Sequence, residues 1–210
     1  NRLQMILDAA ARKTASGQDI SEDLVEARLE SLQINETFDA LLRIAQIEAG
    51  ARKARFTDLQ LGELVEMIAE IYTDVAEDDG KSLSATVAPG ADGWIHGDRE
   101  LLTQLFANLV ENAMRHCPRG TAIALSVTRR TGHILAEVSD NGPGIPAEER
   151  DKVFQRLYRL DDSRSTPGSG LGLSLVRAIA DLHGASIGLE DRHPGLAVIV
   201  SFPMVRPAAA

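Results

Sequence analysis

The sequence has one cysteine, few aromatic residues and no long apolar run. Because Cys117 is alone, an internal disulfide and a zinc site built from cysteines are both excluded. Aromatic residues make up 4% of the 210 residues, so aliphatic side chains must supply most of the core. The apolar run 196–200 is far shorter than the ~18 residues that a membrane helix needs.

Basic residues are also scarce relative to acidic ones. The chain has 22 Lys and Arg against 31 Asp and Glu, which gives a formal net charge of -9. A broad nucleic-acid surface needs a net basic face, so we expect no nucleic-acid partner. A nucleotide site is compatible with this charge, because backbone N–H groups and a few arginines can hold phosphates on an acidic protein.

Residues 1–50 predict two helices joined by a turn at 15–18. Their apolar residues recur at helical spacing, and those of the second helix are Val25, Leu29, Leu32, Phe38, Leu41, Leu42 and Ala45. A hairpin cannot bury such stripes alone, so we expect a homodimer through a four-helix bundle. The alternative is packing on the rest of the same chain. We interpret the basic cluster at 51–55 as a solvated linker.

Residues 56–205 predict a second domain, followed by a frayed tail at 206–210. The pattern predicts helices at 61–76, 98–115 and 171–182 and strands at 56–59, 82–87, 123–127, 134–139, 187–189 and 197–202. Strands grouped as hairpins with helices between them favour an α+β fold, in which helices cover one face of a mixed sheet.

The predicted helix 98–115 carries a polar stripe beside its apolar face. The core face has Leu101, Leu105, Leu109 and Ala113, and the neighbouring stripe has Gln104, Asn108, Asn112 and His116. Asparagine is a poor helix former, so this stripe indicates a ligand-binding face. The alternative is a hydrated surface without a ligand.

Three glycine-containing or arginine-containing segments follow this helix. Asp140 ends a predicted strand before two glycines, so its carboxylate could accept a hydrogen bond from an amine such as that of adenine; the alternative is a plain Gly-Pro turn. The polar connection 147–170 could be a lid whose arginines clamp phosphates, or a surface charge mixture anchored by two aromatics. The glycines of 168–173 could admit phosphates to a helix N-terminus, although their spacing fits neither a dinucleotide fingerprint nor a P-loop.

Together and in this order, the four motifs resemble those of the catalytic core of bacterial sensor histidine kinases. Segment 105–113 is similar to the N-box, 140–144 to the first glycine box, 153–159 to the F-box and 168–173 to the second glycine box. Residues 1–50 resemble the dimerisation and histidine-phosphotransfer hairpin. The resemblance implies an ATP-binding catalytic domain at 56–205, with the sandwich fold of this ATPase superfamily and a lid at about 145–170.

The resemblance also implies ATP and Mg²⁺ as cofactors and a role for each matching residue. Asn112 would ligate Mg²⁺ and Asp140 would hold the adenine amino group. Asn108, Arg156 and Arg159 would be catalytic, with the two arginines as candidates for the γ-phosphate. Further nucleotide contacts are implied for Arg115, His116, Gly142, Gly144, Tyr158, Gly168, Gly170, Leu171 and Gly172.

The chain departs from the family pattern at its phosphoacceptor. Sensor kinases carry a His followed by an acidic residue and Arg-Thr-Pro on the first helix, and residues 1–50 contain no His. The five histidines are His96, His116, His133, His183 and His193. We therefore expect the acceptor segment upstream of Asn1 and a fragment unable to phosphorylate itself. A smaller departure is Leu157, which stands where the F-box commonly has an aromatic.

The resemblance implies transfer of the ATP γ-phosphoryl group to a hairpin His and then to an Asp of a response regulator receiver domain. It also implies the cytoplasmic portion of an inner-membrane sensor, with any membrane attachment upstream. The alternatives are a protein serine kinase or ATPase of the same superfamily, and a non-catalytic ATP-binding scaffold. Hydrolases of this superfamily need a Glu to activate water at the position that matches Asn108.

Overall fold

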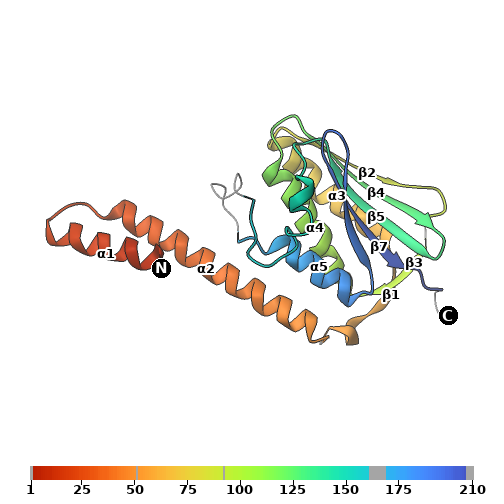
Figure 1. Cartoon of the computed structure of the whole chain (residues 1–210), viewed down its shortest axis with the longest axis horizontal. Coiled ribbons are helices and arrows are strands. Elements are labelled where there is room, and N and C mark those ends of the chain that lie inside the picture. Colours follow the sequence, from red (N-terminus) through yellow and green to blue (C-terminus); the bar gives the residue numbers. More distant parts are fainter. Residues whose placement is uncertain (1, 51, 92, 161–168, 207–210) are drawn as a thin grey trace.

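The computed structural model describes residues 2–50, 52–91, 93–160 and 169–206. It consists of a helical hairpin and a sandwich of helices on a sheet (Figure 1). The hairpin contains α1 (Arg2–Ala15) and the longer α2 (Ser21–Glu48), and α1 folds back along the N-terminal half of α2. Within the described ranges, no helix is both long and apolar enough to cross a membrane.

A five-stranded sheet with the order β2-β4-β5-β7-β6 forms one layer of the sandwich. The β2 and β4 strands are parallel and the other neighbours are antiparallel. The strands are β2 (Ser82–Val87), β4 (Ala122–Arg130), β5 (His133–Asp140), β6 (Ser186–Asp191) and β7 (Leu196–Pro203). A separate antiparallel pair joins β1 (Thr57–Gln60) to β3 (Trp94–Gly97), and β3 was not among the predicted strands.

Three helices cover one face of this sheet: α3 (Leu61–Asp78), α4 (Arg99–His116) and α5 (Gly172–Leu182) (Figure 1). Short 3-10 turns lie at Lys53–Arg55 and Ala147–Glu149. The core between the layers is mostly aliphatic, with Phe106 and Phe202 as its fully buried aromatic residues in the described ranges. The predicted α+β class, with helices on one face of a mixed sheet, is confirmed.

The start of α4 is fixed by hydrogen bonds of Asp98 and His183. The Asp98 side chain accepts from the backbone N–H groups of Glu100 and Leu101, at 2.9 and 3.2 Å. The Asp98 N–H lies 3.0 Å from His183 Nε2, and His183 Nδ1 lies 2.7 Å from the Ile179 carbonyl oxygen. Because Nε2 must accept, the ring is neutral with its proton on Nδ1. Burial lowers the pKa of His183, which favours this neutral form.

Two arginines of the basic cluster after α2 form ion pairs at the start of α4, although residues 53–55 are exposed. The Arg52 guanidinium lies 2.8 Å from the Glu100 carboxylate and 3.5 Å from that of Asp98. Arg55 lies 3.1 Å from the same Glu100 carboxylate. Phe56 then stacks on the His183 ring, with 4.6 Å between the ring centroids. Charge pairing and stacking therefore attach this connection to the start of α4.

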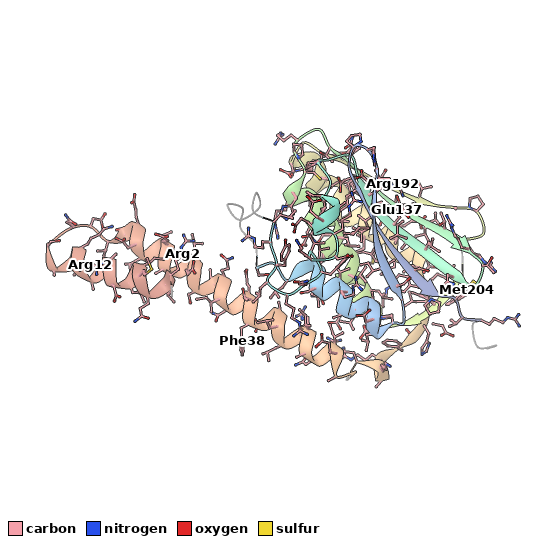
Figure 2. The ribbon with its side chains drawn as sticks, in the orientation of Figure 1. Arg2, Arg12, Phe38, Glu137, Arg192 and Met204 are labelled. Atoms are coloured by element: carbon pink, nitrogen blue, oxygen red, sulfur yellow. The ribbon has the colours of Figure 1, made fainter. Side chains whose placement is uncertain are left out.

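The C-terminal end of α2 packs on the sandwich, whereas most of the hairpin does not. Ile44 and Ile47 are each 1% exposed and belong to the same core as α5. Apolar residues farther along the hairpin are exposed, among them Val25, Leu29 and Phe38. Figure 2 shows the Phe38 side chain directed away from the sandwich. The alternative to the expected dimer, packing on the same chain, thus applies to the C-terminal end of α2.

The cap of α4 is a testable source of stability. Replacing Asp98 by Ala removes the acceptor for two backbone N–H groups, so the free energy of unfolding should fall by about 1–2 kcal/mol. Urea unfolding followed by circular dichroism measures this change. Asp78→Ala, at the exposed end of α3, is the matched control and should change stability by less than about 0.5 kcal/mol. Equal effects of the two substitutions would contradict the capping role.

Candidate functional site

A cavity of about 790 Å³ lies between α4, the end of β5 and the start of α5. Such a volume is within the usual range of small-molecule and cofactor sites. Its lining includes nine of the residues predicted from the sequence: Asn112, Arg115, His116, Asp140, Gly144, Tyr158, Arg159, Gly170 and Gly172. Four motifs that are distant in the sequence therefore meet around one cavity.

One end of the cavity holds the carboxylate of Asp140, the last residue of β5. Its Oδ1 accepts a hydrogen bond from the Gly142 N–H at 2.9 Å, which fixes the orientation of the carboxylate. A Cβ atom on Gly142 would lie 2.5 Å from Cys117 Sγ and 3.0 Å from Asp140 Oδ1, so a side chain cannot be accommodated there. Gly142 thus supports the site from beside the cavity without lining it.

The cavity has an apolar wall next to this carboxylate. It is formed by side chains of α4, of β5 and β7, and of the turn after β5: Leu109, Ala113, Val138, Ile145, Leu196 and Val198. A flat apolar group can therefore be buried here while a polar edge of the same group reaches the carboxylate.

Cys117, which follows α4, lines the cavity and was missed by sequence reasoning. Burial raises the pKa of its thiol to about 12, and the nearby negative charge of Asp140 acts in the same direction. Both causes disfavour a thiolate. Cys117 is therefore a neutral, weakly nucleophilic group under ordinary conditions.

The amide of Asn112 lies against the glycine at the start of α5. A Cβ on Gly172 would lie 3.5 Å from both Asn112 amide atoms and 3.3 Å from Asn108 Oδ1. Asn112 Nδ2 is buried and has no hydrogen-bond partner among the described residues. Asn108 Nδ2 donates to the Gln104 carbonyl oxygen at 2.8 Å, and Asn108 stands beside the cavity instead of lining it.

This asparagine pair fits a Mg²⁺ ion that is bound together with phosphates. Mg²⁺ takes oxygen ligands and is usually held by one or two protein groups plus substrate phosphates. The amide oxygen of Asn112 is such a ligand, and its buried, unsatisfied Nδ2 could donate to a phosphate oxygen. The residues present therefore suit the predicted metal.

Cationic side chains also line the cavity. Burial lowers the pKa of His116, and the positive charges of Arg115 and Arg159 lower it further. All three side chains line the cavity, so cationic groups from α4 and from the segment after Tyr158 converge there. Such a cluster favours an anion, and arginine in particular binds phosphate bidentately. The cavity thus combines the carboxylate of Asp140 with a group of cationic side chains.

Some residues of the F-box-like segment 153–159 line the cavity and others do not. Tyr158 and Arg159 line the cavity, and the Tyr158 hydroxyl donates to the Glu149 carboxylate. Phe154 packs under the Arg177 guanidinium, 4.5 Å from the ring centroid. Arg156, predicted as a phosphate ligand, does not line the cavity and instead forms an ion pair with Glu48 of α2.

The remaining predicted residues lie at the start of α5 or outside the described residues. Leu171 is the N-cap residue of α5 and is 1% exposed, so it contributes to the core next to the cavity. Gly168, together with residues 161–167 of the predicted lid, lies outside the described residues.

The thiol of Cys117 provides a pH-dependent test of this geometry. Its alkylation by iodoacetamide should be half-maximal near pH 12, whereas an unperturbed thiol titrates near 9. Asp140→Asn removes the negative charge and should shift the alkylation profile to lower pH. Because the pKa of Cys117 is higher in the folded state than in the unfolded state, ionisation of this thiol favours unfolding. The free energy of unfolding is therefore unaffected by the thiol below about pH 9 and falls as the pH rises from 9 toward 12. A profile identical in both proteins would contradict the proximity of the two groups.

Comparisons with known proteins agree on one family. Residues 97–206 match the family described as histidine kinase-, DNA gyrase B-, and HSP90-like ATPase. Sensor protein kinase PmrB of Pseudomonas aeruginosa is 33% identical over 183 residues, which are 84% of this chain and 37% of PmrB. The chain spans 21% to 47% of the length of the curated relatives DivL, PmrB and SenX3.

Solved structures show the same fold. The catalytic domain of histidine kinase ThkA aligns with a TM-score of 0.64 and 28% identity, over 70% of this chain and 95% of that domain. ThkA in complex with the response regulator protein TrrA aligns with a TM-score of 0.72 and 20% identity, over 98% of this chain and 58% of ThkA. The chain belongs to the histidine kinase-, DNA gyrase B-, and HSP90-like ATPase family, and it contains a sensor histidine kinase catalytic core.

Proposed function

We propose that the cavity binds ATP with Mg²⁺ and that the chain transfers the γ-phosphoryl group to a hairpin histidine, from which it passes to an Asp of a response regulator. The observation that carries this proposal is the polarity of the cavity. Asp140 and an apolar wall line it together with Arg115, His116 and Arg159, and both arginines lie close enough to His116 to lower its pKa. Adenine with its amino group would suit the carboxylate and the apolar wall, and a triphosphate would suit the cationic side chains.

The residues would act mainly by positioning and by electrostatic stabilisation, as in phosphoryl transfer generally. Asp140 would accept a hydrogen bond from the adenine amino group, and Arg115 and Arg159 would hold phosphate oxygens. Asn112 would hold Mg²⁺, which neutralises charge on the phosphates when it is bound. The glycines at 170 and 172 would let the phosphates approach the N-terminus of α5.

The side chain of Asn108 favours a kinase over a hydrolase. Activation of water requires a group that accepts its proton, and a carboxamide is too weak a base for this. Asn108 stands where hydrolases of the superfamily place a glutamate, and its amide donates to the Gln104 carbonyl oxygen. We therefore propose transfer to a protein side chain in preference to hydrolysis.

Two partners are proposed, a second copy of this chain and a response regulator receiver domain. Exposed apolar residues on both hairpin helices, including Met5, Leu29 and Phe38, support a homodimer through the hairpin. The solved complex of ThkA with TrrA supports a receiver domain as the second partner. The names of the relatives PmrB and SenX3 support a role in a sensor protein, and we propose that the chain is the cytoplasmic portion of an inner-membrane sensor.

Nucleotide binding tests the assignment of Asp140. Asp140→Asn removes a charged acceptor for the adenine amino group, a loss of roughly 1.5–3 kcal/mol, or about 10- to 150-fold in affinity. Titration with a fluorescent ATP analogue in the presence of Mg²⁺ measures the dissociation constants. Asp181→Asn, on the exposed side of α5, makes the same change away from the cavity and should bind like the parent. Equal affinities of both variants and the parent would mean that the adenine site is misassigned.

Phosphoryl transfer tests the reaction itself. Residues 1–50 contain no histidine, so the chain alone should not acquire acid-labile label from γ-labelled ATP. A separately supplied hairpin that carries a complete phosphoacceptor helix should acquire that label when the chain is added. Acid-labile label on the chain alone would contradict the proposal, because in-line transfer tolerates little misplacement of the acceptor. Label on neither protein, despite ATP binding, would favour a non-catalytic scaffold.

A further inference from the structure

Arg156 and Glu48 join the two parts of the molecule beside the cavity. Arg156 belongs to segment 153–159, Glu48 is the last residue of α2, and their side chains form an ion pair. The two side chains are about half exposed, at 47% and 51%. The position of Glu48 is nevertheless fixed, because Ile44 and Ile47 in the preceding turn are buried in the core of the sandwich.

The same segment has a second attachment on its cavity side. The Leu157 N–H donates to the Gly170 carbonyl oxygen at 3.1 Å, and the Tyr158 hydroxyl donates to Glu149. Tyr158, Glu149 and Gly170 all line the cavity. Consecutive residues thus connect the hairpin on one side with the nucleotide site on the other.

Leu157 lies between these two attachments in an unfavourable backbone conformation. Its φ is 61°, in the left-handed region that leucine rarely adopts. Its side chain is 57% exposed, so burial of that side chain does not account for the strain. A residue in this region persists only where its surroundings impose the conformation, and such residues are concentrated at switches and ligand clamps.

We propose that the Glu48–Arg156 pair is a latch between the hairpin and the nucleotide site. In the structure Glu48 holds Arg156 outside the cavity, and bound ATP draws Arg156 from Glu48 toward the phosphates. This inference rests on the proposed function, since it takes the anion in the cavity to be a triphosphate. A phosphate offers more charge and a better bidentate partner than a half-exposed carboxylate, so the two anions compete for one guanidinium.

Because of this competition, ATP binding and the Glu48–Arg156 contact must weaken each other. If Glu48 opposes ATP binding, ATP must weaken the contact between the end of α2 and segment 153–159 by the same factor. Release of Arg156 also lets Leu157 leave the left-handed conformation. The end of α2 would then lose its contact with segment 153–159 when the nucleotide site is loaded, while Ile44 and Ile47 keep it packed on the sandwich.

Glu48→Gln tests the latch by removing the competing charge. An exposed ion pair of this type predicts an ATP dissociation constant about two- to fivefold lower than that of the parent at low salt. The difference should disappear near 1 M salt, where the screening length is about 3 Å. Glu36→Gln is the matched control, because Glu36 is an exposed residue of the same helix and undergoes the same change of charge. It should bind ATP like the parent.

Hydrogen exchange provides a second readout that does not depend on affinity. ATP should accelerate exchange in the last turn of α2, at 44–48, in the parent, and have less effect there in Glu48→Gln, whose latch is already open. Equal affinities of the parent and Glu48→Gln, or exchange at 44–48 that ATP does not alter in a parent that binds it, would overturn the latch alone. A parent that binds no ATP would overturn the proposed function and the latch with it.

Discussion

Helix α4 supplies part of the core and part of the cavity, so its position determines where the functional groups lie. Its apolar face, with Leu101, Leu105 and Leu109, is buried in the sandwich, and Asn112 and His116 on the next face line the cavity. Asp98 fixes the start of the helix, and the neutral His183 fixes the backbone of Asp98. A rotation of α4 would therefore cost core packing and capping at the same time, which keeps the polar stripe directed at the cavity.

The start of α4 is also where the hairpin meets the catalytic domain. Arg52 binds the carboxylates of Asp98 and Glu100, and Phe56 stacks on His183, so the chain leaving α2 is attached to the cap of the helix that carries Asn112. The F-box-like segment 153–159 makes a second connection with the hairpin, through the ion pair of Arg156 with Glu48. Ion pairs and ring stacking therefore join the hairpin to the catalytic domain at two places, the start of α4 and segment 153–159.

Much of the fold and most of the cavity could be predicted because their signals are local. Alternating apolar residues predicted β4 and β5, and the fourfold spacing of Asn108, Asn112 and His116 predicted one face of α4. The strand β3 was missed because it has only four residues. Ile95 is its one apolar residue buried in the core, and a single such residue gives no alternating pattern.

Features that depend on tertiary contacts were not predictable in this way. The role of Arg52 depends on carboxylates almost fifty residues away, and that of Arg156 depends on Glu48, so their sequence neighbours give no signal. Cys117 was missed for a related reason. It follows His116 directly, but its place beside Asp140 depends on how α4 and β5 end against each other.

The central claim is that one cavity binds ATP with its adenine at Asp140 and its phosphates at Arg115 and Arg159. Photolabelling with 8-azido-ATP and Mg²⁺, followed by peptide mapping, tests this placement directly. The reactive group is on the adenine ring, so the label should lie on residues near Asp140, within 138–146 or at 196–198 of β7, and excess ATP should abolish it. Label on the hairpin, on the exposed face of the sheet or at Arg115 and Arg159, or label that ATP does not displace, would contradict the account.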